Sequence, residues 1–115
     1  MNCQIDFAPE FRRPILDGTK TATTRFLKVE PELRGIGVDQ EVECTIAKIN
    51  VFAKIRITQI ENCRFDSIPD NIARIENYRN PKELQTVLIG FYPSISQSDE
   101  LTIFHFELDS TIGVS

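Results

Sequence analysis

The sequence predicts an α+β fold, a small mixed or antiparallel β-barrel of roughly five to six strands with about three short helices. Segments that alternate apolar and polar residues lie on both sides of a stretch with helical spacing. Such strands must each bury one face and hide their edges, and closing into a barrel does both. The chain of 115 residues fits one domain, 1–115, whose ends 1–4 and 109–115 we expect to be loose.

The first third predicts a strand, a short helix and a second strand. Residues 3–7 alternate weakly and predict the first strand. Residues 11–17 have their apolar side chains on one helical face, and Gly18 follows where a C-terminal cap belongs. Residues 21–26 are rich in β-branched side chains and predict the second strand, and a polar loop follows over 30–37.

The remainder predicts a hairpin, two helices and a last strand. Residues 41–60 alternate on both sides of Asn50, which we expect to be the turn residue. Helical spacing over 67–78 predicts one helix, and Asn80 is placed to cap another, with proline next. The apolar run 101–108 predicts the last strand.

Charge and composition restrict the class of function. The net charge is −4 and the isoelectric point is about 5.0, which argues against an extended cationic surface for nucleic acid. The basic residues are unevenly placed, and no lysine or arginine follows Lys82. Those of the first third are Arg12, Arg13, Lys20, Arg25, Lys28 and Arg34. This distribution is compatible with a local anionic or nucleotide ligand near the N-terminal third.

The cysteines predict neither a disulfide framework nor a metal site. Cys3, Cys44 and Cys63 are odd in number and far apart, which indicates free thiols in a reducing compartment, so we expect a cytoplasmic protein. His105 adds no metal-ligand spacing, and we expect no metal and no cofactor. No apolar run is long enough for a membrane span, and residues 1–4 do not begin a signal peptide.

The segment from Gly18 to Arg25 concentrates the most potential chemistry. A lysine, several hydroxyls and an arginine can form a small cationic pocket lined by hydroxyls. Positions 20 and 23 of a regular strand point to opposite faces. A site that uses both Lys20 and Thr23 therefore needs the lysine in the turn before the strand, which Gly18 permits.

The pocket face of this strand then follows from its alternation. Thr21, Thr23 and Arg25 share that face, and Thr24 faces away. An amide-cleaving site needs a nucleophile, a base and a group that stabilises the oxyanion. Thr23 with Lys20 as base is one such arrangement, and Arg25 is the candidate for the oxyanion.

The same segment resembles the signature of the ASCH domain (activating signal cointegrator homology), which has a PUA-like fold. The resemblance includes the flanking residues 11–16, Tyr92-Pro93 and Phe106-Glu107, and it extends over about 5–107. It implies a β-barrel with a helical segment inserted late in the chain.

A second resemblance concerns Glu76-Asn77, which is similar to a glutamate-asparagine pair in small bacterial ASCH enzymes that hydrolyse N(4)-acetylcytidine. It implies Lys20, Thr23 and Glu76 as the catalytic set, with no metal or cofactor. Arg25, Thr21 and Gly18 are the expected substrate-binding residues. The chain departs from the family pattern at Phe26, where an acid is usual, and at Val38, which separates a glycine and an aspartate that are usually adjacent.

The sequence leaves three functions open. The first hypothesis is an amidohydrolase acting on N(4)-acetylcytidine or a related acylated nucleoside, a small-molecule partner. The second is a non-catalytic RNA-binding module, as PUA-like folds often are, and the third is a ribonuclease. The sequence does not indicate an oligomeric state.

Each candidate residue also has an ordinary structural interpretation. Lys20 at a strand entrance is typical of a solvated edge charge that carries little packing. Arg25 can pair with a helix carboxylate, and Glu76 in the middle of a helix can face solvent. His105 between two phenylalanines is typical of a hydrogen-bonded barrel residue.

Overall fold

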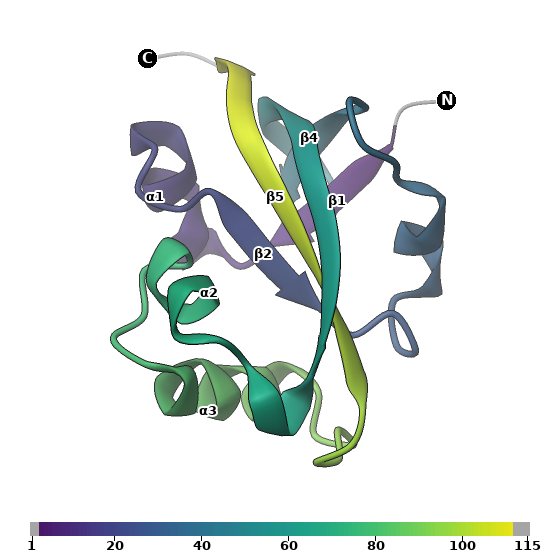
Figure 1. The fold of residues 1–115 in the computed structure, drawn as a ribbon. Coiled ribbons are helices and arrows are strands. Elements are labelled where there is room, and N and C mark those ends of the chain that lie inside the picture. The colour runs from purple at the N-terminus through teal and green to yellow at the C-terminus, as the bar shows by residue number, and fades with distance from the viewer. Residues whose placement is uncertain (1–2, 112–115) are drawn as a thin grey trace.

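The computed structural model describes residues 3–111, which form one five-stranded sheet with three α-helices packed on it (Figure 1). The strands are β1 (Gln4–Phe7), β2 (Ala22–Arg25), β3 (Glu41–Ile46), β4 (Asn50–Arg64) and β5 (Glu100–Thr111). The helices are α1 (Arg12–Asp17), α2 (Asp70–Ile75) and α3 (Pro81–Phe91). Short 3-10 turns lie at Pro9–Phe11, Pro31–Gly35 and Phe65–Ser67. The predicted α+β fold is confirmed.

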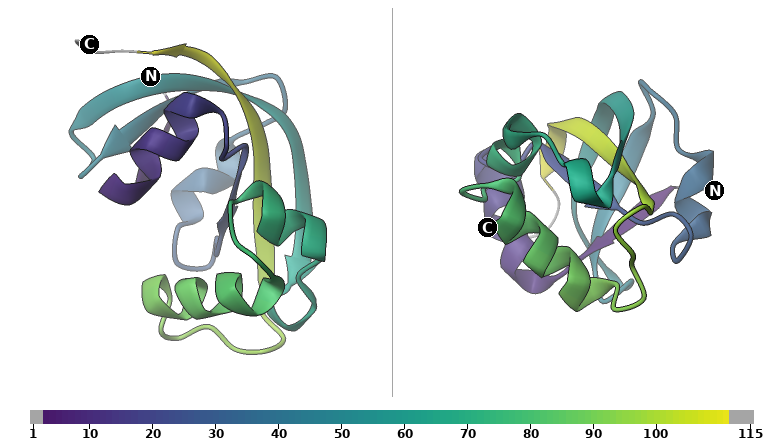
Figure 2. Two further views of the ribbon diagram at one scale, coloured as in Figure 1. Left: turned by 90° about the vertical axis from the view of Figure 1, so that its left-hand side faces the viewer. Right: turned by 60° about the horizontal axis from the view of Figure 1, so that its bottom comes forward.

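The sheet is mixed and has the strand order β1-β3-β4-β5-β2. β1 runs parallel to β3, and the remaining pairs are antiparallel. The long strands β4 and β5 bend together across the molecule (Figure 2). β1 and β2 are the two edges of the sheet, so the structure is a half-barrel rather than the closed barrel that edge protection predicted. The side chain of Arg25 on β2 bridges to β1 by donating to the Asp6 carbonyl at 2.7 Å.

The hairpin between β3 and β4 turns earlier than predicted. Ala47 and Lys48 have φ of 56° and 59°, and Asn50 is the first residue of β4. The Asp6 carboxylate explains how a turn without glycine is held: it accepts from the Lys48 backbone N–H at 2.6 Å and from Thr45 Oγ1 at 2.7 Å. The prediction of a turn at Asn50 is therefore wrong. The local sequence gives no sign of the long-range contact with Asp6 that places the turn earlier.

The two faces of β5 belong to different hydrophobic clusters. Phe104 and Phe106 pack in one cluster, whereas Leu101 and Ile103 pack in the other. Burial on both faces explains why this strand is a continuous apolar run. The second cluster includes buried residues of α2 and α3, and these two helices lie together against that side of the sheet (Figure 1).

The predicted loose ends are partly wrong. β1 begins at Gln4, which lies opposite Glu43, and β5 continues to Thr111, which lies opposite Ala53. The end of β5 is exposed and polar, so it lacks the apolar pattern that identifies a strand. Residues 1–2 and 112–115 are outside the described part of the chain.

The cysteines are free thiols. Burial raises the pKa of Cys44 to about 12 and the pKa of Cys63 to about 11, which keeps both thiols protonated and unreactive near neutral pH. Within residues 3–111, no helix is long and apolar enough to cross a membrane.

Candidate active site

A cavity of about 430 Å³ lies where the sheet is not closed, between its two edge strands and α3. Its charged and hydroxyl-bearing wall includes Asp6, Lys20, Thr23, Thr24, Arg25, Glu30, Lys48 and Glu76. Its apolar wall includes Phe7, Phe11, Leu84, Val87, Leu88 and Phe91. The structure therefore brings the three predicted catalytic residues and the predicted oxyanion-binding arginine to one cavity.

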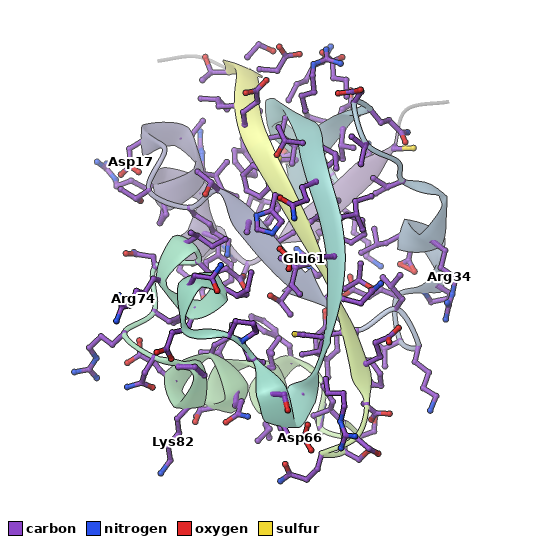
Figure 3. The ribbon with its side chains drawn as sticks, viewed as in Figure 1. Asp17, Arg34, Glu61, Asp66, Arg74 and Lys82 are labelled. Carbon is purple, nitrogen blue, oxygen red and sulfur yellow. The ribbon has the colours of Figure 1, made fainter. Side chains whose placement is uncertain are left out.

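Lys20 lies in the turn before β2, as expected from Gly18, whose φ is 84°. Its side chain is 3% exposed and Nζ donates to Glu76 Oε1 at 3.0 Å. Nζ also lies 4.8 Å from the centre of the Phe11 ring. The interpretation as a solvated edge charge is wrong. A solvated lysine points away from the protein, as the exposed side chain of Lys82 on α3 does (Figure 3).

Burial is the main influence on Lys20 and lowers its pKa below 10.5. The Glu76 carboxylate acts in the opposite direction, and the nearby positive charge of Arg25 lowers the pKa further. A lysine in this environment gives up its proton more readily than one in water, which a general base requires.

The sequence predicted Glu76 in the middle of a helix. In the structure Glu76 is instead the residue that caps the C-terminal end of α2. Asn77 then adopts a left-handed conformation with φ of 72°. The N–H of Asn77 donates to the Arg74 carbonyl and that of Tyr78 donates to the Ala73 carbonyl, each at 2.9 Å. This pair of bonds is a Schellman motif, which ends the helix and turns the Glu76 side chain inward, where it is 4% exposed.

The end of α2 is held against β2 by the backbone of Thr21. The Thr21 N–H donates to the Ile75 carbonyl at 3.3 Å, and the Thr21 carbonyl accepts from Phe106 N–H at 2.9 Å. These bonds place Glu76 beside Lys20. Neither Thr21 nor Gly18 is among the residues that line the cavity, so both contribute backbone geometry here rather than a side chain.

Thr24 is part of the cavity wall, so the expectation that it faces away is wrong. Its N–H donates to Glu76 Oε1 at 3.2 Å, and its hydroxyl donates to the other carboxylate oxygen of Glu76. Among the strands that the structure describes, β2 pairs only with β5, so its second edge is open. Side chains from both faces of β2 therefore border the same cavity, which strict alternation did not predict.

Arg25 occupies the opposite face of β2 with Thr23. Its Nε donates to Thr23 Oγ1 at 2.9 Å, and one terminal nitrogen donates to Glu30 Oε1 at 3.0 Å. The guanidinium carbon lies 4.9 Å from the centre of the Phe7 ring. The ordinary interpretation expected the carboxylate partner of Arg25 to come from a helix. The partner is instead Glu30, which lies in the loop after β2.

The cavity holds two polar clusters. Lys20, Glu76 and Thr24 form one, and Thr23, Arg25 and Glu30 form the other. In the part of the chain that the structure describes, no hydrogen bond joins Lys20 to Thr23, and no group of histidine, cysteine, aspartate or glutamate is arranged to hold a metal ion.

Three contributors to the site were missed from the sequence: Thr24, Glu30 and Tyr92. Tyr92 donates its hydroxyl hydrogen to Glu30 across 62 positions of sequence, a contact that local patterns do not encode. His105 belongs to neither cluster, because its ring nitrogen Nε2 contacts Glu61 of the neighbouring strand. It is the hydrogen-bonded barrel residue that its ordinary interpretation predicted.

Asn77→Val should destabilise the protein by about 1–2 kcal/mol, because a β-branched residue resists the left-handed conformation. Asn77→Gly should stay within about 0.5 kcal/mol of wild type, since glycine adopts this conformation freely. Asn77 is exposed, so neither change removes buried contacts. Urea denaturation measures both, and equal stability of the valine and glycine variants would contradict the role of the left-handed turn.

No protein-family model matches the sequence, and no curated protein matches it. Solved structures do match. A protein of Enterococcus faecalis V583 superposes with a TM-score of 0.76 at 16% identity, over 96% of this chain and 77% of that one. The ASCH domain of Lactobacillus crispatus JV V101 superposes with a TM-score of 0.71 at 17% identity, over 86% and 70% of the two chains.

The ASCH protein of Zymomonas mobilis adds a third match, with a TM-score of 0.63 at 14% identity over 96% of this chain and 72% of that one. Identities this low establish architecture only. The superpositions cover 86% and 96% of the present chain, which therefore has the PUA-like fold of an ASCH domain.

Proposed function

We propose that the protein is an amidohydrolase that removes the acyl group from the exocyclic nitrogen of an acylated cytidine, with N(4)-acetylcytidine as the representative substrate. The observation that carries the proposal is the meeting of a buried lysine, a threonine hydroxyl and a buried glutamate in one cavity. The choice of substrate rests on the resemblance of these three positions to the small bacterial ASCH enzymes.

The proposed reaction uses Thr23 as nucleophile and Lys20 as base. Neutral Lys20 accepts the hydroxyl proton while Thr23 Oγ1 bonds to the acyl carbon. The resulting ammonium of Lys20 then gives that proton to the exocyclic nitrogen as its bond to the acyl carbon breaks. Water attacks the acyl-threonine in the same way, which releases the acid and restores the threonine. Substrate binding has to bring Lys20 and Thr23 into hydrogen-bond contact.

Glu76 and Arg25 have supporting roles in this scheme. Glu76 is paired with Lys20 and stabilises the ammonium that forms when the lysine takes the proton. Arg25 has a guanidinium at the cavity wall beside Thr23, where it can stabilise the negative charge that develops on the acyl oxygen.

The charge balance of the cavity favours a neutral ligand. Each buried cation is matched by a carboxylate, Lys20 by Glu76 and Arg25 by Glu30. An anionic phosphate would have to compete with these carboxylates, whereas an uncharged acylated base would not. The apolar wall with Phe11 and Phe91 offers aromatic surface for such a base. This balance supports a nucleoside substrate over a phosphate-gripping RNA-binding role.

The test is incubation of the purified protein with N(4)-acetylcytidine, with cytidine and acetate followed by chromatography. We expect equal amounts of both products, formed at a rate proportional to protein concentration. Lys82→Met serves as the matched control, since Lys82 is an exposed lysine outside the cavity and its loss should leave the rate unchanged. A wild-type protein that releases no cytidine would contradict the proposal.

A further inference from the structure

We infer that Tyr92 and Glu30 form a positioning pair that holds Arg25 against Thr23. Through Arg25, this pair orients the hydroxyl that acts as nucleophile. The catalytic part of the inference rests on the proposed function, whereas the contacts that fix Arg25 do not. Neither Tyr92 nor Glu30 belongs to the proposed catalytic set, which consists of Lys20, Thr23 and Glu76.

The first step concerns the geometry of Arg25. Three of its nitrogens donate to three different acceptors: Thr23 Oγ1 at 2.9 Å, Glu30 Oε1 at 3.0 Å and the Asp6 carbonyl at 2.7 Å. A guanidinium is a rigid planar fork, so three acceptors define its plane and its rotation. The Asp6 carbonyl is fixed by β1. The side chain of Glu30 is flexible by itself. Its hydrogen bond with Arg25 therefore constrains the arginine only if other contacts fix the position of the Glu30 carboxylate.

Tyr92 holds the Glu30 carboxylate. The Tyr92 hydroxyl donates to Glu30 Oε2, the oxygen that does not accept from Arg25. Burial raises the pKa of Tyr92, so the hydroxyl stays protonated and remains a donor. The tyrosine is itself fixed at the end of α3, where its backbone N–H donates to the Leu88 carbonyl at 2.7 Å.

The Glu30 backbone is held by the same neighbourhood. Its N–H donates to the Phe26 carbonyl at 3.0 Å, which folds the loop back toward β2. The Phe26 ring packs edge-on against the Tyr92 ring, with 5.8 Å between ring centres. Phe26 therefore places both members of the pair, and the Glu30 side chain has little freedom to leave Arg25.

The consequence for Thr23 is directional. Arg25 Nε–H occupies one acceptor position of the Thr23 hydroxyl, so the hydroxyl proton points away from Arg25 and is available to a base that substrate binding brings into contact. If Tyr92 or Glu30 loses its polar contact, Arg25 can rotate and Thr23 loses this constraint. Such a change should slow the chemical step and leave substrate binding nearly unaltered.

The experiment compares Tyr92→Phe and Glu30→Gln with wild type in two measurements. The first is the ¹⁵N–¹H NMR signal of Arg25 Nε, identified by its loss in Arg25→Lys. The second is kcat and KM for N(4)-acetylcytidine. We expect the Arg25 signal to shift and broaden in both variants and kcat to fall roughly tenfold, with KM changing less than about twofold. Glu32→Gln, which makes the same charge change at an exposed site of the same loop, is the control and should match wild type.

The two measurements separate the possible failures. An Arg25 signal that is the same in wild type and both variants would overturn the positioning pair, whether or not the protein hydrolyses the substrate. A changed signal with an unchanged kcat would overturn the link to Thr23. A wild-type protein without hydrolysis would overturn the proposed function, and the NMR signals would still decide whether Tyr92 and Glu30 fix Arg25.

Discussion

Lys20→Met should lower kcat for N(4)-acetylcytidine by roughly 10²- to 10⁴-fold, the usual contribution of a general base. Methionine keeps much of the length and apolar volume of lysine, so the Phe11 side of the cavity stays filled. The proton of Thr23 then has no amine to receive it. A variant that retains wild-type kcat would remove Lys20 from the mechanism.

The same substitution should also destabilise the fold, contrary to the expectation that a lysine at a strand entrance carries little packing. Lys20 and Glu76 are 3% and 4% exposed, and removal of one partner of a buried ion pair costs about 3–5 kcal/mol. The double variant Lys20→Met with Glu76→Gln removes both charges and should recover part of this stability in urea denaturation. It should remain inactive, which distinguishes lost chemistry from lost folding.

The strands and helices were largely predictable because each has a local cause. The alternation in β3 and β4 follows from burial on one face, and Asn80 caps α3 by accepting from Glu83 N–H at 2.9 Å. The turn at Ala47 and Lys48 was not predictable in this way. It depends on the carboxylate of Asp6, which is 42 positions away from Lys48.

Lys20, Thr23 and Glu76 were expected to lie together, and all three line the cavity, but the contacts that connect the polar residues of the cavity were not predictable. Lys20 before the strand followed from Gly18 and from the alternation of β2. The partner of Lys20 is Glu76, whose inward direction depends on a left-handed residue just after α2. Thr24 entered the site because β2 is an edge strand, a property of strand order that local sequence does not contain.

Glu76→Gln should lower kcat by roughly 10- to 100-fold and change KM less than about twofold. The amide keeps the size of the side chain, but it cannot supply the negative charge that stabilises the Lys20 ammonium during the reaction. Glu76 raises the pKa of Lys20, so its loss should lower that pKa further. The neutral base is the reactive form, and kcat/KM therefore rises with pH through the pKa of Lys20.

The pH dependence of kcat/KM shows in which direction Glu76 shifts the pKa of Lys20. In wild type the rise should occur below pH 10.5, because burial lowers the pKa of Lys20 from that value. In Glu76→Gln the rise should occur at a lower pH than in wild type, while the plateau is lower. Asp70→Asn removes an exposed carboxylate from the start of the same helix and should leave the profile in place. A Glu76→Gln profile that coincides with wild type in both position and height would show that the carboxylate neither sets the pKa of Lys20 nor takes part in catalysis.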